Sequence, residues 1–474
     1  MTAPQQSGAG KTAPKNRPAV ISHARKVAFN VLLAVERGQS HSDDLLRGKA
    51  VNALSAPDRN LATALALGVL RWQIRLDHQL QALLKHPNAR LDPEVLIALR
   101  LGAFQLLHLD RIPARAAIDE SVELAKQAGH RFASGMVNAV LRKLAAAPQA
   151  NFSEDSATSL ALAQAHPAWM VARWANFYGL DAARAICRHG QTQPVLTLRI
   201  HDPAVAEELA ADGIHLQPGE LLTVAQTVVS GDGPGDLFSS AAFSQGRLRL
   251  QDEGSQLIAE LASARCAPPP KSILDSCAAP GNKTLILAQR NLKARIVACE
   301  SSPQRFEPLS QRLAPLGDRI ECRLIDATTL NENSTFDLAL ADVPCSGAGT
   351  LGRNPEIRHR LRVEDLPRQA ERQRSILLAA LRAVRPGGCA IYSTCSLEPE
   401  ENEQVVAAVL AETPNTRQIS LASRIEILDR EGILRPSAAD RLKASLTPQG
   451  ALRLLPGAFH TDGFFIAIIE KLSG

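Results

Sequence analysis

The sequence predicts a chain of three parts: an all-α N-terminal domain, a small α/β middle module and a C-terminal doubly wound α/β domain. In the first third, apolar residues recur at three- and four-residue spacing, which is typical of amphipathic helices. From residue 270 onward, short β-rich runs alternate with helical stretches, the pattern of a mostly parallel sheet. At 474 residues, the chain is also too long for one ordinary hydrophobic core.

The N-terminal part begins with a polar tail over residues 1–20, which has no apolar segment of a signal peptide and is predicted to be disordered. Helices are then predicted over residues 21–147, because helix-starting residues precede each periodic segment. These residues are Ser22, the pair Ser55 and Pro57, the pair Asp92 and Pro93, and Pro113. Gly38 can end the first helix, and "RFASGMVNAVLRKLAA" completes the all-α domain.

The middle part, residues 148–265, has a different sequence pattern, in which one helical segment is followed by strand-like segments. The segment "HPAWMVARWANFYG" predicts one more helix, whereas "PVLTLRI", "IHLQPG" and "RLRLQD" have strand character. We expect a linker helix followed by a small α/β module, and nothing in its sequence indicates chemistry.

The C-terminal part, residues 266–474, contains six strand-like runs. They are "SILD", "RIVACE", "IECRLID", "FDLALAD", "CAIYST" and "FFIAIIEK". In a doubly wound sheet the ligand binds at the carboxyl ends of the strands, so functional residues are expected there.

The turn after the first run, "SCAAPGNKT", contains small residues and leads into a helix near Lys283. Such a turn lets backbone N–H groups and a helix N-terminus approach a ligand closely. A phosphate-binding P-loop is excluded because Asn282, not glycine, precedes the lysine, and a GxGxxG fingerprint is absent as well.

Acidic residues end four of the runs: Asp275, Glu300, Asp326 and Asp342. Any one of them can be explained as a helix N-cap. Four together at a ligand edge are harder to explain in that way, since like charges crowd there without a partner. Glu300 lies 25 residues after Asp275, where an acid usually holds ribose hydroxyls, and Asp326 can meet an adenine amino group.

Two of the eight cysteines, Cys345 and Cys395, stand at strand ends, 50 residues apart. A thiolate there could be exposed and stabilised by backbone N–H groups. Five further cysteines are interpreted as inert core residues: Cys187, Cys266, Cys299, Cys322 and Cys389. Two cysteines without further ligands at suitable spacing make a poor zinc site, so no metal is expected.

Composition limits the partners only weakly. The net charge of +5 permits a polyanionic partner, while 4% aromatic residues disfavour binding of single strands chiefly by base stacking. No uninterrupted apolar run of about 18 residues is present to span a membrane. We therefore expect a soluble, cytoplasmic protein without a membrane partner.

Four segments resemble the RNA cytosine-C5 methyltransferases of the Nol/Nop/Sun family: "DSCAAPGNKT", "DVPCSGAGTLGRNPEIR", "YSTCSLEPEENE" and "PGAFHTDGFFIAIIEK". The helical segment "PARAAIDESVELAKQAGHRFASGMVNAVLRKL" resembles the antitermination factor NusB. The resemblance implies a NusB-like RNA-binding domain and a Rossmann-like domain that uses S-adenosyl-L-methionine. It extends over nearly the whole chain except the first 20 residues.

By this resemblance, Cys395 is the nucleophile that adds to C6 of cytosine, Asp342 contacts the base edge, and Cys345 takes part in release of the covalent product. The cofactor would contact the turn residues Cys277, Ala278, Ala279, Pro280, Gly281, Asn282 and Lys283, together with Glu300, Asp326 and Asp342.

The resemblance also implies a substrate: one cytosine of 16S rRNA, either as free RNA or in an early small-subunit particle. Lys and Arg of the first two parts, with Arg353, Arg358 and Arg360, would contact phosphates. Three alternatives stay open, namely the same chemistry on tRNA, a catalytically silent assembly factor and, least favoured, a small-molecule methyltransferase. A monomer is expected.

Overall fold

The computed structural model describes residues 20–148, 150–229, 236–264 and 268–473. The predicted tail and Cys266 therefore lie outside the described residues, except for residue 20. Within these ranges the chain forms two compact units, residues 1–151 and 152–474, which are described separately.

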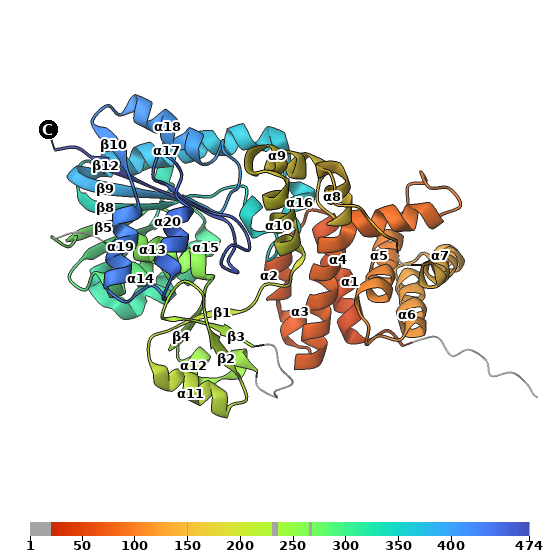
Figure 1. The fold of residues 1–474 in the computed structure, drawn as a ribbon. Helices are drawn as coiled ribbons and strands as arrows, with labels where there is room; N and C mark the ends of the chain where they lie inside the picture. Colours follow the sequence, from red (N-terminus) through yellow and green to blue (C-terminus); the bar gives the residue numbers. More distant parts are fainter. Residues whose placement is uncertain (1–19, 149, 230–235, 265–267, 474) are drawn as a thin grey trace, which may run out of the picture. The chain divides into compact units, whose positions relative to one another are not determined.

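The first unit is all-α, as predicted (Figure 1). Its helices are α1 (His23–Glu36), α2 (Ser42–Leu46), α3 (Lys49–Asn52), α4 (Ala56–Leu83), α5 (Pro93–His108), α6 (Ala114–Gln127), the 3-10 turn η1 (Arg131–Ala133) and α7 (Ser134–Ala146). Ser55 accepts a hydrogen bond from the backbone N–H of Asp58 at the start of α4, as expected of an N-cap. Helix α4 extends well beyond the predicted segment because Leu76 and Leu80, four residues apart, continue its buried stripe.

The second unit begins with three helices: α8 (Ala157–Ala163), α9 (Ala168–Tyr178) and α10 (Leu180–Gln191). The sequence predicted α9 alone. Helix α10 follows Gly179 directly, and the positive φ of 86° at this glycine lets the chain change direction without a loop.

The middle module is an antiparallel sheet of order β2-β3-β1-β4, flanked by two helices. Its elements are β1 (Thr197–Ile200), α11 (Pro203–Ala211), β2 (Leu216–Pro218), β3 (Ala225–Val228), the 3-10 turn η2 (Leu237–Ser239), α12 (Ala241–Ser244) and β4 (Leu248–Leu250). Three of these strands coincide with the predicted ones. Strand β3 was missed because its "AQTV" lacks an alternating apolar pattern.

The C-terminal part is built on an eight-stranded sheet in which β5, β6, β7, β8 and β9 run parallel. Its helices are α13 (Glu253–Ser263), α14 (Asn282–Arg290), α15 (Pro303–Leu313), α16 (Ile357–Arg360), α17 (Leu366–Ala383), α18 (Glu403–Glu412), α19 (Ala422–Arg430) and α20 (Ala438–Ala444). Its strands are β5 (Ser272–Asp275), β6 (Arg295–Glu300), β7 (Ile320–Leu324), β8 (Phe336–Asp342), β9 (Val384–Thr394), β10 (Thr416–Ile419), β11 (Leu452–Leu454) and β12 (Phe464–Lys471). Four 3-10 turns complete it: η3 (Ala314–Arg319), η4 (Ala327–Thr329), η5 (Ala348–Thr350) and η6 (Val363–Asp365).

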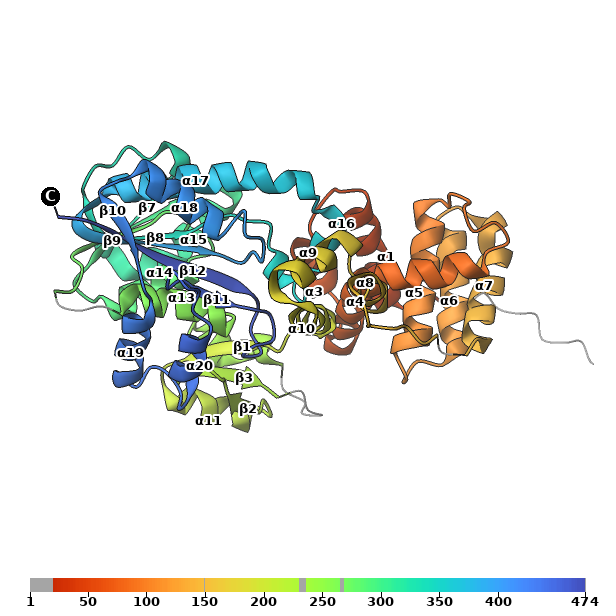
Figure 2. The same cartoon turned by 45° about the horizontal axis from the view of Figure 1, so that its top comes forward.

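Strand order is β10-β12-β9-β8-β5-β6-β7, and β12 pairs antiparallel with β9 (Figures 1 and 2). Successive residues of β8 face opposite layers: Leu338 and Leu340 pack with α13 and α14, while Ala339 and Ala341 pack with α17 and α18. The sheet is thus covered on both faces, which explains why its strands read as continuous apolar runs. The predicted doubly wound domain is confirmed, and β10 and β11 are additions to its antiparallel end.

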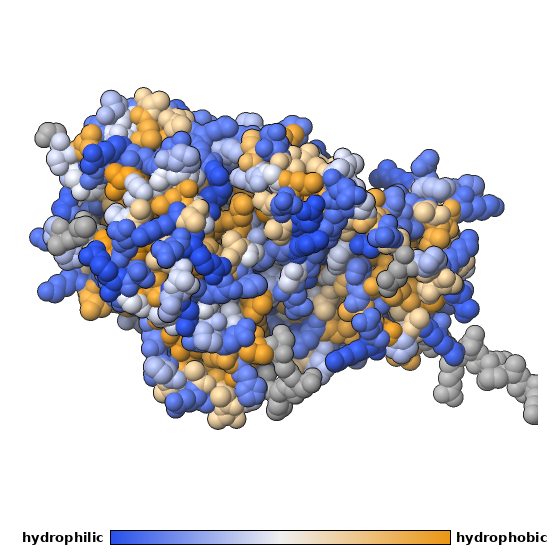
Figure 3. All heavy atoms as spheres, in the orientation of Figure 1, coloured by the Kyte–Doolittle hydropathy of each residue, from blue (hydrophilic) through white to orange (hydrophobic). Residues whose placement is uncertain are grey.

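The surface carries scattered apolar side chains among many hydrophilic ones on the face drawn in Figure 3. Phe132 and Leu292 are the most exposed of the large hydrophobic residues other than Val20. Isolated exposed apolar residues are ordinary on soluble folds and indicate no site by themselves. Within the described ranges, no helix has the length and apolar character needed to cross a bilayer.

Candidate active site

The carboxyl ends of the parallel strands bring the predicted site residues to one edge of the sheet. Asp275 and Glu300 end β5 and β6, Asp342 ends β8, and Cys395 follows β9. Residue pairing places β8 between β5 and β9, so the loops of these three strands are neighbours. Asp326 lies two residues beyond β7, at the far side of this edge.

The turn of residues 277–283 connects β5 to α14 and approaches the edge closely. Gly281 has a φ of 97°, and a Cβ at this position would lie 3.0 Å from the Leu309 Cδ1 atom. Any other residue would be strained here. The Asn282 side chain is already engaged, since it donates to the Leu250 carbonyl and accepts from Arg312.

Lys283 joins this turn to the neighbouring strand. Its Nζ atom lies 2.7 Å from Asp342 Oδ2, and Ser393 on β9 donates a hydrogen bond of 2.7 Å to Asp342 Oδ1. Burial lowers the pKa of Lys283, but the carboxylates of Asp342 and Asp275 outweigh this effect and raise it overall. The Lys283 side chain therefore carries a positive charge next to Asp342 and near Cys395.

The acids of the edge differ in their surroundings. Asp275 is buried and accepts a hydrogen bond of 2.7 Å from Thr284, and its burial raises its pKa to about 6. Glu300 is buried as well and accepts from the Ser302 backbone N–H at 2.7 Å. Asp326 caps the turn η4 through Thr328, so the N-cap explanation holds for this residue, although its side chain remains 43% exposed.

Cys345 and Cys395 come together although 50 residues separate them. Their Sγ atoms lie 3.2 Å apart, and the Cys395 backbone N–H donates to Cys345 Sγ at 3.3 Å. The interaction with the Cys395 thiol, together with burial, raises the pKa of Cys345 well above its usual range. Both residues are half-buried, whereas Cys187, Cys299 and Cys389 are buried in the core.

The remaining predicted core cysteine within the described ranges, Cys322, is half-buried on β7. Burial raises the pKa of both Cys187 and Cys299 to about 12, which keeps these thiols protonated and unreactive. The core position predicted for Cys322 is wrong, and exposure alone does not separate Cys345 and Cys395 from Cys322, whereas the contact between their Sγ atoms does.

Several polar residues around the cysteines were not identified from sequence. Ser346, Ser396 and Glu401 form a buried hydrogen-bonded group behind them. Helix α9 reaches the same loop: Arg173 donates to Glu398 at 2.7 Å, and Trp174 donates to it at 3.2 Å. The acidic run "EPEEN" was the available signal, but nothing in it indicates which acids turn inward.

Of the three arginines predicted to contact phosphate, Arg358 needs correction, whereas Arg353 and Arg360 are half-buried and their predicted contacts stay predictions. Arg358 is 2% exposed and donates to the backbone carbonyls of Ala165, Gly190 and Leu351, so its predicted phosphate contact is wrong. Arg353 pairs with Asp252 and Asp462. A motif-flanking arginine is easily mistaken for an RNA ligand because sequence alone does not reveal burial.

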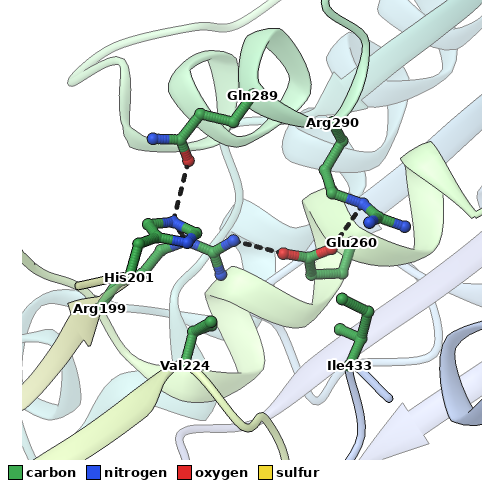
Figure 4. A pocket seen from close by; sticks show the side chains of 7 residues that line it. All are labelled: Arg199, His201, Val224, Glu260, Gln289, Arg290 and Ile433. Atoms are coloured by element: carbon green, nitrogen blue, oxygen red, sulfur yellow. Dashed lines mark hydrogen bonds and ion pairs between the residues drawn. The ribbon is translucent and has the colours of Figure 1, made fainter. Parts of the chain in front are cut away.

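A cavity of about 400 Å³ lies away from this edge, between the middle module and the sheet (Figure 4). Arg199 donates to Glu260 at 2.5 Å, and Arg290 lies 3.2 Å from the other oxygen of the same carboxylate. His201 lies within hydrogen-bond distance of Gln289. Because its charged groups are paired with one another, we interpret this cavity as part of the contact between module and sheet.

Three family comparisons agree with this architecture. Residues 267–470 match the family described as 16S rRNA methyltransferase RsmB/F, and residues 22–146 match the NusB family. Residues 166–230 match the ferredoxin-like domain of RsmF/B-like methyltransferases. A Bacillus subtilis relative, named probable ribosomal RNA small subunit methyltransferase B, is 34% identical and covers 94% of this chain and 98% of its own.

The chain belongs to the RsmB/F family of 16S rRNA methyltransferases. A Pseudomonas putida relative, ribosomal RNA small subunit methyltransferase B, is 31% identical over 95% of this chain and 98% of its own. Among solved structures, PH0851 superimposes with a TM-score of 0.76 at 23% identity, covering 96% of this chain and 100% of that one. This likeness supports the fold.

The methyl donor of this RsmB/F family member is S-adenosyl-L-methionine. The polar groups at the sheet edge fit S-adenosyl-L-methionine. Carboxylates at Glu300 and Asp326 can accept hydrogen bonds from hydroxyl and amino groups, and they suit a ligand that carries positive charge. The close turn at Gly281 leaves backbone N–H groups free of a bulky side chain.

Within the described ranges, no group of three or more His, Cys, Asp and Glu side chains is placed to hold a metal ion.

Proposed function

We propose that this protein methylates C5 of one specific cytosine of 16S rRNA through a covalent bond between Cys395 and C6 of the base. The observation that carries the proposal is the meeting of two thiols, 3.2 Å apart, beside Asp342 at the ligand edge of the sheet. A single thiol there would suit simple nucleophilic attack, whereas two can divide attack and release between them.

Carbon 5 of cytosine is a weak nucleophile, and covalent catalysis splits its high barrier into smaller steps. The Cys395 thiolate adds to C6, which makes C5 enamine-like. Asp342 contacts the N3 and N4 edge of the base: its carboxylate accepts from the N4 amino group and from the N–H formed when N3 takes up a proton from solvent, which neutralises the charge that develops on the base. S-adenosyl-L-methionine supplies the methyl group when bound. Loss of the C5 proton and elimination of the thiolate from C6 then restore the aromatic ring.

Lys283 supports this chemistry from the first turn of α14. Its positive charge lies beside Asp342, and its pKa is raised, against the effect of burial, by Asp342, Asp275 and Cys395. Cys345 stays uncharged, because its raised pKa keeps its proton on sulfur. We assign the protonated Cys345 thiol to release, where it stands beside the departing sulfur.

The cofactor would be held by three groups of residues. The turn of residues 277–283 would contact the methionine part, Glu300 the ribose, and Asp326 the adenine, with Asp342 between cofactor and base. The burial of Glu300 and the exposure of Asp326 agree with an inner and an outer end of the ligand.

The choice of 16S rRNA rests on the names of the relatives and on the NusB match. The target base must leave its stack to reach such an edge, which favours a loop or junction. We further infer that the protein acts as a monomer in the cytoplasm, on free RNA or on an early small-subunit particle.

The test uses purified protein and its Cys395→Ala variant with S-adenosyl-L-methionine and separate pools of small-subunit rRNA, large-subunit rRNA and tRNA. Bisulfite sequencing then reads 5-methylcytosine. One modified site in small-subunit rRNA, absent with the variant, is the expected result. A tRNA site would overturn the substrate, and no modification in any pool would favour a catalytically silent assembly factor.

The role of Cys345 is tested by its Cys345→Ala variant. This change leaves the nucleophile and removes the thiol assigned to release, so a covalent protein–RNA complex should accumulate. Denaturing gel electrophoresis detects that complex, and the Cys345→Ala/Cys395→Ala double variant should form none. Normal turnover by Cys345→Ala would contradict the assignment.

A further inference from the structure

A buried carboxylate that has no cationic partner among the described residues lies directly behind the two cysteines. Glu401 is fully buried, and its carboxylate accepts hydrogen bonds from neutral donors of Ser346, Gln373 and Ser396. Taking a carboxylate out of water without a counter-charge is costly, so such a group usually has a task. The hydrogen bonds of Glu401 indicate what that task is.

The carboxylate of Glu401 joins the two cysteine loops to each other. Its Oε1 atom accepts from the backbone N–H of Ser346, the residue after Cys345, at 2.8 Å. Its Oε2 atom accepts from the hydroxyl of Ser396, the residue after Cys395. One side chain thus holds the residue that follows each thiol.

A second set of bonds reinforces this bridge. The Ser346 and Ser396 hydroxyl oxygens lie 3.0 Å apart, and because Ser396 donates its proton to Glu401, Ser346 must donate to Ser396. From α17, the amide of Gln373 donates to Glu401 Oε1 at 2.8 Å and to the carbonyl of Pro344 at 3.0 Å. Both sides of Cys345 are therefore tied to the same carboxylate.

The backbone of Glu401 is fixed as well. The Tyr392 hydroxyl, on the strand that carries Cys395, donates to the Glu401 carbonyl at 2.5 Å. This bond ties the acid to β9, so a change at Glu401 is transmitted to both thiols.

We propose that Glu401 is a positioning residue that sets the separation of the Cys345 and Cys395 thiols. The proposal rests on the function proposed above. Glu401 itself touches neither base nor cofactor in this scheme and acts through Ser346 and Ser396. The hydrogen bond to Cys395 and burial raise the pKa of Cys345 most, and the negative charge of Glu401 adds to this rise.

The first test is Glu401→Gln, which keeps the shape but replaces an acceptor by a donor opposite Ser396. We expect kcat for methylation to fall by about 100-fold, because small displacements of reacting groups cost this much. The KM for RNA should stay within about threefold, since the residue lies behind the thiols. The matched control, Glu403→Gln, changes an acid of the same motif that pairs with Arg453, and it should keep wild-type kcat.

A second readout separates positioning from general loosening. In the Cys395→Ala background, the rate of Cys345 alkylation by iodoacetamide is followed against pH by peptide mass spectrometry. Adding Glu401→Gln should move the midpoint of this profile to lower pH, because a negative charge is removed. A loosened loop would raise the rate at every pH and leave the midpoint in place, which would overturn the proposed effect on Cys345.

If Glu401→Gln does not fold, Ser396→Ala removes one arm of the bridge and keeps the acid, and kcat should fall by about tenfold. Wild-type kcat in a folded Glu401→Gln or Ser396→Ala variant overturns the inference while the proposed function stands. An inactive wild-type protein would instead overturn the proposed function, and the alkylation profile would still test the effect of Glu401 on Cys345.

Discussion

Two regions of the second unit concentrate buried charge, but they compensate it differently. In the cavity between module and sheet, Arg199, Glu260 and Arg290 form a chain of opposite charges that is complete within the protein. At the edge of the sheet four carboxylates meet three cations: Lys283 pairs with Asp342, Arg305 with Glu300 and Arg372 with Asp326, while Asp275 accepts a hydrogen bond from the neutral Thr284. Charges that neutralise one another join parts of a fold, whereas an excess of one sign is suited to a ligand of the opposite sign.

The largest effect on stability is expected where the pairing is complete. Glu260→Gln leaves Arg199 buried without its partner, so the free energy of unfolding should fall by about 3–5 kcal/mol. Urea unfolding measures this change. The control Glu431→Gln removes an exposed partner of Arg290 and should cost less than about 1 kcal/mol. A folded Glu260→Gln protein with a large loss of kcat would contradict a purely structural role for the cavity.

At the sheet edge, Asp342→Asn should affect the reaction in addition to the fold. We expect kcat to fall by about 10²–10³-fold, as when one stabilising group is removed from a reacting site. Single-turnover methylation measures this loss, and thermal unfolding measures the separate loss of stability expected because Lys283 loses its partner carboxylate. Asp318→Asn, at an exposed position, serves as the control. Unchanged kcat in Asp342→Asn would remove the distinction between the two regions.

Asp275 gives the edge a dependence on pH. Its folded-state pKa of about 6 lies above its ordinary value, so between pH values of about 4 and 6 the folded protein keeps a proton that the unfolded chain has released. The free energy of unfolding should therefore fall as pH rises through this interval, by at most about 3 kcal/mol. Asp275→Asn should lack this contribution. Denaturant unfolding at several pH values compares the two proteins, and parallel profiles would contradict the assignment.

The smallest effect is expected at the contact between α9 and the Cys395 loop. Arg173→Gln removes two charged hydrogen-bonded contacts, to Glu398 and Glu400, and should cost about 1.5–3 kcal/mol. Burial raises the pKa of Glu398, and Arg173 opposes this rise. The pKa of Glu398 should therefore be higher in the variant than in the wild-type protein. Thermal unfolding at pH 6 and 8 measures both effects. The exposed Arg188→Gln serves as the control, and equal losses in both variants would contradict a special role of α9.

The same contrast explains what could be predicted from the sequence. Strand ends such as Asp342 and the turn at Gly281 are marked by local residue patterns, so the position of the site on the sheet follows from chain order and the rule for parallel strands. Arg358 was assigned wrongly because its role depends on burial by α10, which is distant in sequence. Glu401 was missed because its role depends on burial by α17, which is also distant in sequence. Short strands such as β3 and β11 were also not predicted, because three or four residues are too few to show a hydrophobic periodicity.

The pairing of β12 with β9 has a consequence for the synthesis of the chain. Phe465 pairs with Thr394, directly before Cys395, the proposed nucleophile. Gly463 donates to the Gly349 carbonyl, and Gly349 donates to the Cys395 carbonyl. A growing polypeptide that has passed Cys395 already contains every residue assigned to the reaction, yet β9 remains an open edge until residues 464–471 leave the ribosome. Premature termination in this interval should yield an aggregation-prone and inactive product rather than a weakened enzyme.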